Sequence, residues 1–320
     1  MPFSFPGAAN GYAAISTYTE EQQLPLLTKL VTKPTSVNSL TPITGVKYRT
    51  QMTIVSSSIV FQSASACAWN ATGDVSFQGR VLEVAPIKIQ TELCPRTIER
   101  YWLQTMLPLG SAEPTFEQPL AQVILEDHIA RIGSQLETCI WQGATTGSGN
   151  LRFFDGFNRL TDVASASCIS ANTAAVTAIT SATIEQVVNL IYQNCPAAIL
   201  DQPDLKIFCG WDVYRLAMQK YVDRNFFNFN PTDFVKNGLG GNGFILPGTN
   251  VPIVPVQGLN GTNRLMAGCT SNLFYGVDLI NDEDKIDMFY SKEFDVVKLA
   301  VYFKYGVNFA KPEEVVYFKL

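Results

Sequence analysis

The chain contains a single histidine, His128, so any catalytic site that relies on an imidazole must use this residue. Ser-His-Asp and Cys-His nucleophile sites both need such a base, and a metal site with two or three histidines is excluded within one chain. His128 lies between Asp127 and Ile129, in the middle of a long helical pattern. This position favours a packed or half-exposed structural role, and we predict no catalytic one.

Cysteines are the second potential source of chemistry, as nucleophiles or as metal ligands. The chain has seven, an odd number, and they are scattered without metal-ligand spacing or a disulfide framework: Cys67, Cys94, Cys139, Cys168, Cys195, Cys209 and Cys269. Most lie in apolar surroundings, as in Ile207-Phe208-Cys209. We therefore expect free buried thiols that behave as small apolar residues, in a protein made in a reducing cytoplasm.

Two glycine clusters resemble phosphate-binding loops only superficially. Residues 238–243 match the bare glycine pattern of dinucleotide binding, but no credible strand precedes them and no credible helix follows. Residues 143–149 lack the Lys followed by Ser or Thr with which a phosphate loop ends. The first cluster is therefore interpreted as a flexible loop and the second as the end of a helix, and we predict no cofactor-binding residue.

The acidic run at 281–284 could attract a divalent cation, but it lacks the spacing of a calcium loop and is interpreted as a solvated turn. Asp201 and Asp204 flank Pro203, where Asp is expected for its backbone hydrogen bonds. We predict no metal ligand. Four phenylalanines near Arg224 are interpreted as a subunit contact or a local core and not as base-stacking residues: Phe226, Phe227, Phe229 and Phe234.

The composition describes a globular protein with a surface that is poor in charge. Of 320 residues, 47% are hydrophobic and 16% are charged, against about 25% charged in an average soluble protein. A large core and a surface covered by other subunits explain this equally well. The net charge is −5 without a basic run, which argues against a dedicated nucleic-acid reader and still permits indifferent containment of nucleic acid. No signal peptide or membrane span is recognisable.

The first half of the chain predicts an arm, a hairpin and a rod-like helix. Residues 1–45 are rich in Gly, Pro, Ser and Thr and are interpreted as an N-terminal arm. Period-2 alternation over 46–59 and 75–89 predicts one long hairpin, which must lie against another element or chain because an isolated ribbon is marginal in water. A helical stripe predicts a helix over 120–142: Leu125, Ile129, Ile132, Leu136 and Ile140. A surface connection of low periodicity is expected up to residue 181.

The second half predicts an α/β unit and a closing sheet. A capping-box pattern at Thr183 begins a helix that stops near Pro196; a strand over 205–209 and a helix capped by Asp212 follow. Loops over 225–261 surround a short strand at 251–256 and are expected to be interaction surfaces. Strands at 285–290, 296–309 and 315–320 are expected to form one antiparallel sheet. The predicted fold class is α+β.

This order of parts resembles the major capsid proteins of tailed double-stranded-DNA bacteriophages. Two stretches carry the resemblance in detail, AILDQPDLKIFCGWDVYR at 198–215 and FYGVDLINDEDKIDMFY at 274–290 with its continuation to PEEVV at 312–316. The resemblance covers most of residues 45–320. It implies the tailed-phage major capsid fold, with these parts: an N-terminal arm 1–45, an extended hairpin loop 46–92, a peripheral domain 93–182 and 281–320 with spine helix 120–142, and an α/β axial domain 183–280.

The resemblance also implies a function and partners. Similar proteins form hexamers and pentamers that close into an icosahedral head around double-stranded DNA, without sequence-specific contact. The expected location is the virion capsid, assembled in the host cytoplasm, and the expected partners are further copies of the chain with scaffold, portal and decoration proteins; no membrane and no enzymatic activity are expected. Some relatives link Lys to Asn covalently, but nothing identifies a partner for Lys47 or Lys88, so no cross-link is predicted. The short arm fits either a separate scaffold protein or prior cleavage.

Two other interpretations remain at this stage. An encapsulin, a bacterial shell that encloses enzymes instead of a genome, shares the fold and differs in its contents. A hydrolase or transferase that uses Cys209 or His128 belongs to a different class, and no partner for either residue is visible in the sequence.

Overall fold

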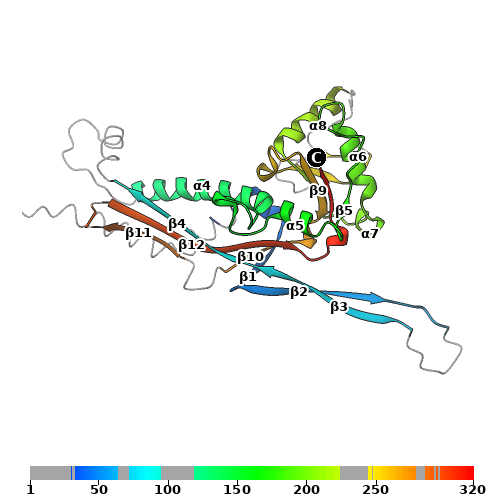
Figure 1. Cartoon of the computed structure of the whole chain (residues 1–320), viewed down its shortest axis with the longest axis horizontal. Helices are drawn as coiled ribbons and strands as arrows, with labels where there is room; N and C mark the ends of the chain where they lie inside the picture. The colour runs from blue at the N-terminus through cyan, green and yellow to red at the C-terminus, as the bar shows by residue number, and fades with distance from the viewer. Residues whose placement is uncertain are drawn as a thin grey trace, which may run out of the picture.

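The computed structural model describes residues 30, 33–63, 72–94, 119–223, 244–246, 248–278, 285–291, 293–294 and 296–320. Two separate hydrophobic cores organise them. One lies mainly in an elongated body, in which a long helix lies along a sheet, and also includes Phe208, Met266 and Tyr317 of the second body; the other lies within that more compact body of strands and shorter helices (Figure 1). The mixture of helices and sheets agrees with the predicted α+β class.

The elongated body is built on a five-stranded sheet around the 14-residue strand β12 (Val296–Phe309). Three strands pair antiparallel with β12, and β1 pairs parallel with one of them, β10. The four partners are β1 (Thr41–Thr44), β4 (Ala85–Leu93), β10 (Leu273–Val277) and β11 (Lys285–Ser291). Because β12 has neighbours along both edges, most of its side chains are buried.

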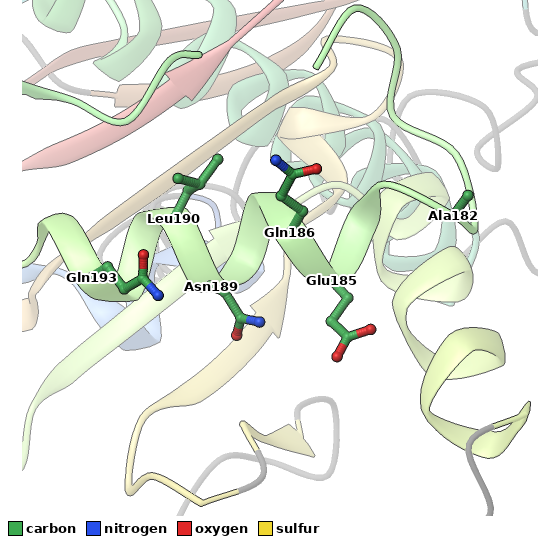
Figure 2. Close-up of a pocket in the computed structure, with 6 residues that line it drawn as sticks. All are labelled: Ala182, Glu185, Gln186, Asn189, Leu190 and Gln193. Atoms are coloured by element: carbon green, nitrogen blue, oxygen red, sulfur yellow. The ribbon is translucent and has the colours of Figure 1, made fainter. Parts of the chain in front are cut away.

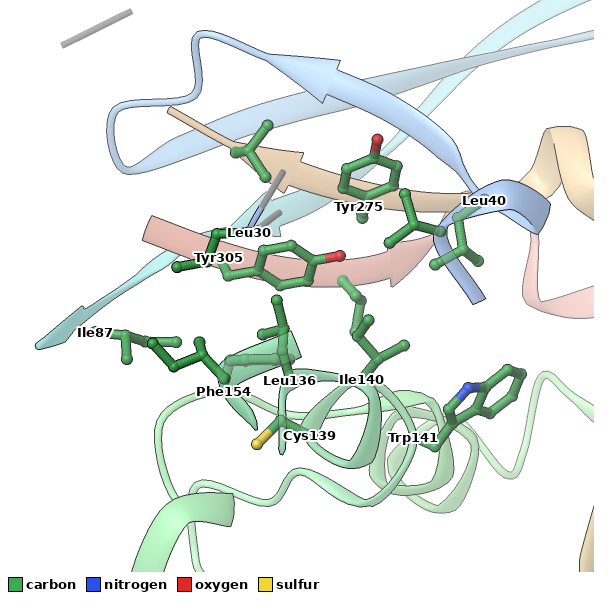
Figure 3. Packing of buried hydrophobic residues seen from close by; sticks show 14 of the residues in the cluster. Leu30, Leu40, Ile87, Leu136, Cys139, Ile140, Trp141, Phe154, Tyr275 and Tyr305 are labelled. Atoms are coloured by element: carbon green, nitrogen blue, oxygen red, sulfur yellow. The ribbon is translucent and has the colours of Figure 1, made fainter. Parts of the chain in front are cut away.

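Helix α4 (Pro119–Gln142) supplies the other side of this core and confirms the predicted rod. Its 24 residues span about 36 Å. The five residues of the predicted apolar stripe are each at most 9% exposed: Leu125, Ile129, Ile132, Leu136 and Ile140. Figure 3 shows Leu136 and Ile140 directed from the helix toward the strand that carries Tyr305. The 3:4 spacing of apolar residues therefore fixes which face of the helix meets the sheet.

The compact body is a six-stranded sheet in the order β5-β13-β9-β6-β8-β7. Its strands are β5 (Ile169–Ser170), β6 (Leu205–Cys209), β7 (Phe244–Ile245), β8 (Pro252–Pro255), β9 (Arg264–Cys269) and β13 (Val316–Lys319). Helices α6 (Ile184–Asn194) and α8 (Trp211–Asp223) contribute their apolar faces to the second core, next to the short α7 (Ala197–Leu200). The predicted succession of helix, strand and helix is confirmed.

Strand pairing differs from the expectation in two places. The last strand, β13, does not join β11 and β12; it lies between β5 and β9 in the six-stranded sheet. The stretch at 84–89 is not the second half of a hairpin, because β4 pairs with β12. Alternation within a strand shows which side chains share a face, but it carries no information about the partner strand. The short turns before β4 and β13 suggested pairing with the preceding strand, and this prediction was wrong.

The end of the predicted arm is part of the folded body. Residues Thr35–Ser39 form a 3-10 turn, η1, that buries Ser36, Val37 and Ser39, and β1 follows in the five-stranded sheet. Leu40 is 7% exposed. The apolar side chains of this segment are sufficient to dock it, although Gly, Pro, Ser and Thr dominate the region.

Local details also differ. The expected irregular connection contains helix α5 (Phe157–Val163), with Phe157 fully buried. Thr183 occupies the N-cap position of α6 as expected but makes no side-chain capping hydrogen bond there, and its hydroxyl donates instead to the carbonyl of Ala178 at 2.7 Å. Asp212 lies inside the first turn of α8, whose first amide, on Trp211, donates to the side-chain oxygen of Asn260 at 2.6 Å. Short 3-10 turns complete the described structure: η2 (Gly149–Leu151), η3 (Gln257–Leu259), η4 (Thr270–Asn272) and η5 (Pro312–Glu314).

Candidate assembly surface

A two-stranded ribbon projects from the elongated body (Figure 1). It consists of β2 (Arg49–Ser58) and β3 (Asp74–Glu83), paired antiparallel along their whole length. The two strands form a sheet of their own within the described structure. The predicted hairpin is thus confirmed for these strands. A ribbon this long exposes two broad faces, and a pair of strands alone is at best marginally stable in water.

One face of the ribbon is apolar and exposed. The register places Val55 opposite Phe77, with Val75 and Val81 on the same face, because directly paired residues of two strands point to the same side. Their side chains are 50–71% exposed. The three residues that follow β2 are also apolar and exposed: Ile59, Val60 and Phe61 are 78%, 53% and 98% exposed. Apolar side chains in such a continuous run mark an interaction surface.

The apolar face also carries little charge. The two strands contain four charged residues, Arg49, Asp74, Arg80 and Glu83. Arg49 and Glu83 pair with each other at 3.1 Å near the body. The face between Gln51 and Ser57 has no charged side chain on either strand. Depletion of charge is characteristic of the centre of a protein–protein interface.

The opposite face is fixed to the body near the base of the ribbon. Met52 and Leu82 are 7% and 0% exposed. The guanidinium of Arg80 lies 4.4 Å from the centre of the Phe309 ring, and burial lowers the pKa of Arg80. The side-chain amide of Asn308 donates to the carbonyl of Val81 at 2.8 Å. The body therefore sets the direction of the ribbon and leaves its apolar face uncovered.

Two glycines permit this close approach. A Cβ at Gly306 of β12 would collide with the carbonyl oxygen of Glu83, which is backbone. A Cβ at Gly276 of β10 would lie 2.9 Å from side-chain carbons of both Leu82 and Val84. Glycine is needed where two backbones approach within ordinary side-chain distance. These positions form the seat on which the ribbon rests.

Two smaller surfaces are candidates for contacts with other molecules. Phe289, near the end of β11, and Phe294, between β11 and β12, are 45% and 61% exposed, and the ammonium of Lys298 lies 4.5 Å from the centre of the Phe294 ring. The outer face of α6 forms an open hollow of about 490 Å³ lined by Ala182, Glu185, Gln186, Asn189, Leu190 and Gln193. Figure 2 shows these side chains on α6 and, for Ala182, on the segment just before it, without a convergent set of groups that could do chemistry.

The sequence-derived chemical candidates are dispersed. His128 is half-buried on α4, with Nε2 3.4 Å from the hydroxyl of Thr91; Cys209 is buried in β6. Asp204 accepts from the amide of Ser271 at 2.9 Å and so holds η4 in place. Lys47 is exposed before β2, whereas Lys88 lies on β4, its ammonium 5.7 Å from the ring centre of Tyr302. The cluster at 238–243, the acidic run at 281–284 and the aromatic residues at 226–234 lie outside the described residues.

The thiols confirm the expectation of free, buried cysteines at five positions, Cys139, Cys168, Cys195, Cys209 and Cys269, whereas Cys94 is exposed and Cys67 lies outside the described residues. Burial raises the pKa of Cys195 to about 11 and that of Cys269 to about 12. Burial also raises the pKa of Cys209 far above its ordinary range. A thiol with a raised pKa is a poor nucleophile at neutral pH.

Within the described ranges, no three potential metal ligands of the His, Cys, Asp and Glu types cluster together. No helix in the same part of the chain is both long and apolar enough to cross a membrane.

Sequence reasoning identified the hairpin by its alternation. It did not predict that Ile59–Phe61 would be exposed, nor that Gly276 and Gly306 would form the seat of the ribbon. Only the isolated glycines within strand patterns signalled the close approach.

The sequence matches no protein-family model, and no curated protein matches it. Solved structures nevertheless match over most of the chain. A chain of the satellite phage P4 procapsid is 12% identical, with a TM-score of 0.62 over 92% of this chain and 89% of that one. A chain of the cyanophage A-1(L) capsid is 11% identical, with a TM-score of 0.59 over 90% and 92%.

A third match, to the capsid of the Myoviridae phage XM1, is 11% identical and has a TM-score of 0.54 over 88% of this chain and 90% of that one. At sequence identities of 11–12%, the similarity to these structures shows a common fold and nothing more. Its extent includes both bodies and leaves little of either chain uncovered. The chain therefore has the fold of the major capsid proteins of tailed bacteriophages.

Proposed function

We propose that this chain is a major capsid protein that assembles into an icosahedral phage head around double-stranded DNA. The observation that carries the proposal is the β2–β3 ribbon, which is anchored on one face and presents an uncharged apolar row on the other. In the proposed shell a neighbouring copy covers this row. Each buried Val or Phe contributes about 1.5–3 kcal/mol, and symmetry repeats the contact around every ring of subunits.

The proposal assigns roles to the parts of the chain. Residues 46–92 contain the extended loop, of which β2 and β3 form the free ribbon and β4 the attachment to the sheet. Residues 93–182 and 281–320 form the peripheral domain with its spine helix, and 183–280 form the axial domain around five-fold and six-fold axes. Two strands cross these sequence boundaries: β10, within 183–280, belongs to the five-stranded sheet of the elongated body, and β13, within 281–320, belongs to the six-stranded sheet of the compact body.

The proposed role is structural and non-catalytic, and the similar structures are those of phage capsids. The proposed partners are other copies of the chain in hexamers and pentamers, with scaffold, portal and decoration proteins, in a virion assembled in the host cytoplasm. The net charge of −5 and the lack of a basic run suit a wall that contains DNA without binding its sequence. An encapsulin-type shell would share the fold and enclose protein instead.

Negative-stain electron microscopy with sedimentation tests the proposal, on the full chain expressed alone and together with its neighbouring genes. We expect closed shells, or rings of five and six subunits. A monomer under both conditions would contradict assembly. Analysis of the contents of the shells then separates the two kinds of cargo: DNA supports the phage head, whereas a co-purified enzyme supports the encapsulin.

A further inference from the structure

Helix α4 contains a buried carboxyl group, Glu137, which is 2% exposed. Two of its hydrogen bonds come from one residue of η1, Ser36, and Thr35 and the backbone of Gly258 contribute further ones. The amide of Ser36 donates to Oε2 at 3.0 Å and its hydroxyl donates to Oε1 at 2.5 Å. The indole N–H of Trp141 in turn donates to the same hydroxyl at 2.7 Å. A chain of hydrogen bonds therefore runs from Trp141 through Ser36 to Glu137.

No cation compensates this carboxyl within the part of the chain that the structure describes. Lys33 packs with its aliphatic carbons over Gly133, one turn earlier on α4. Lys206 of β6 donates to the hydroxyl of Ser39 at 3.2 Å. From β12, Tyr305 contributes a fully buried hydroxyl without a hydrogen-bond partner in the described ranges. An ionised carboxyl without a cation is costly to bury.

Three parts of the subunit meet at this point. The segment with η1 and β1 lies on one side of Glu137, and η3 lies on another. A Cβ at Gly258 of η3 would collide with the backbone oxygen of Glu137 and the ring of Trp141. The side-chain amide of Gln142 donates to the carbonyl of Gly258 at 2.6 Å. A change at Glu137 thus acts on the N-terminal segment, the long helix and a loop that leads into β9.

We propose that Glu137 and Ser36 form a proton-controlled latch, which holds residues 33–44 on the subunit when the carboxyl is neutral and loosens them when it is ionised. The latch is separate from the apolar ribbon that carries the proposed assembly. Its release would free η1 and β1 from the edge of the five-stranded sheet, where β1 pairs with β10 alone. An edge strand of four residues is the least costly strand of the sheet to detach.

The direction follows from the environment of the carboxyl. Burial raises the pKa of Glu137 above its ordinary value, and the hydrogen bonds from Ser36, Gly258 and Thr35 oppose this only partly. Release of the segment exposes the carboxyl and returns its pKa toward that ordinary value. The docked state is therefore fully stabilised below the ordinary Glu pKa and loses this stabilisation as the pH rises through the raised value.

Hydrogen–deuterium exchange of residues 35–44 tests the latch on the full chain. Wild type is compared with Glu137→Gln at each pH, so the intrinsic pH dependence of exchange cancels. We expect a wild-type to variant rate ratio that is constant at low pH and rises with pH, by up to about tenfold for each unit by which the pKa is raised. Glu313→Gln, a substitution at an exposed carboxyl, should give a flat ratio against wild type.

A flat ratio for Glu137→Gln over the same range would overturn the latch. Ser36→Ala supplies a second test, since it removes the hydroxyl and leaves Glu137 ionisable; exchange in 35–44 should be faster than in wild type at every pH. If Glu137→Gln fails to fold, infrared spectroscopy of wild type decides. Loss of a protonated carboxyl band at the pH where exchange increases supports the latch, and absence of such a band near neutral pH contradicts it.

Discussion

Val55 and Phe77 face each other directly across the β2–β3 ribbon, on the side that the subunit leaves exposed. They are 59% and 71% exposed, although cross-strand pairs of this type normally stabilise a sheet by burying each other. Met52 and Leu82, on the opposite face, are buried against the body. The ribbon is therefore anchored to its own subunit by one face, and the proposed shell would cover the other face with a neighbouring copy.

Replacement of Phe77 by Ser should weaken assembly and leave the subunit folded. The exposed ring contributes little to the monomer, whereas its burial by a neighbour is worth about 2 kcal/mol per contact, or roughly 30-fold in a contact's equilibrium constant. Sedimentation velocity would report the loss of large particles, and circular dichroism would report an unchanged melting temperature. The matched control is Gln78→Ser on the other face of the same strand; assembly equally impaired by both variants would contradict the assignment of the apolar face.

Replacement of Gly306 by Ala should displace the base of the ribbon. The added methyl group meets the backbone oxygen of Glu83, which cannot rotate away as a side chain can. Overpacking of this kind typically costs about 1–3 kcal/mol. Thermal unfolding measures the loss, and Gly268→Ala in β9 is the control because its nearest neighbours are 4.0 Å away. Equal melting temperatures for the two variants would show that the backbones at Gly306 and Glu83 leave room for a methyl group.

The sequence predicts individual elements of this fold better than their assembly. The stripe from Leu125 to Ile140 locates α4 because helical periodicity is a local property. The partner of β13 depends on contacts distant in sequence, and alternation alone cannot identify it. The same limit applies to the candidate sites. The ribbon is visible as a pattern, whereas Ser36 and Glu137 meet across 101 residues without a local signal.

Thiol modification should distinguish the exposed Cys94 from the five cysteines that the structure describes as buried. At pH 8 the raised pKa values of Cys168 and Cys195, each about 11, leave almost no thiolate, and their burial blocks access. We expect iodoacetamide to label Cys94 in the native protein, and the buried thiols only after denaturation, as measured by peptide mass spectrometry. Cys94→Ser should remove that native label. Rapid native labelling of Cys195 would contradict the described core and revive a reactive-thiol interpretation.

Acidification, which tightens the contact at Glu137, should instead weaken a set of ion pairs near the end of the chain. Asp162 of α5 pairs with Arg264 of β9 and with Lys319 of β13, both at 2.7 Å. Desolvation would raise the pKa of Asp162, but its hydrogen bonds and the two cations outweigh this and lower it. A lowered pKa in the folded state gives stability that is present above the ordinary Asp value and is lost as the pH falls through the lowered one.

Asp162→Asn should therefore destabilise the protein at neutral pH and remove part of its acid sensitivity. All three side chains are partly exposed, so after solvent screening we expect a loss of about 1 kcal/mol or less. Chemical denaturation of wild type and variant at pH 7 and near pH 3 measures both effects, and Asp127→Asn, at an exposed pair on α4, is the control. The difference between wild type and Asp162→Asn should shrink toward pH 3; a constant difference would show that the charge of Asp162 does not stabilise the chain terminus.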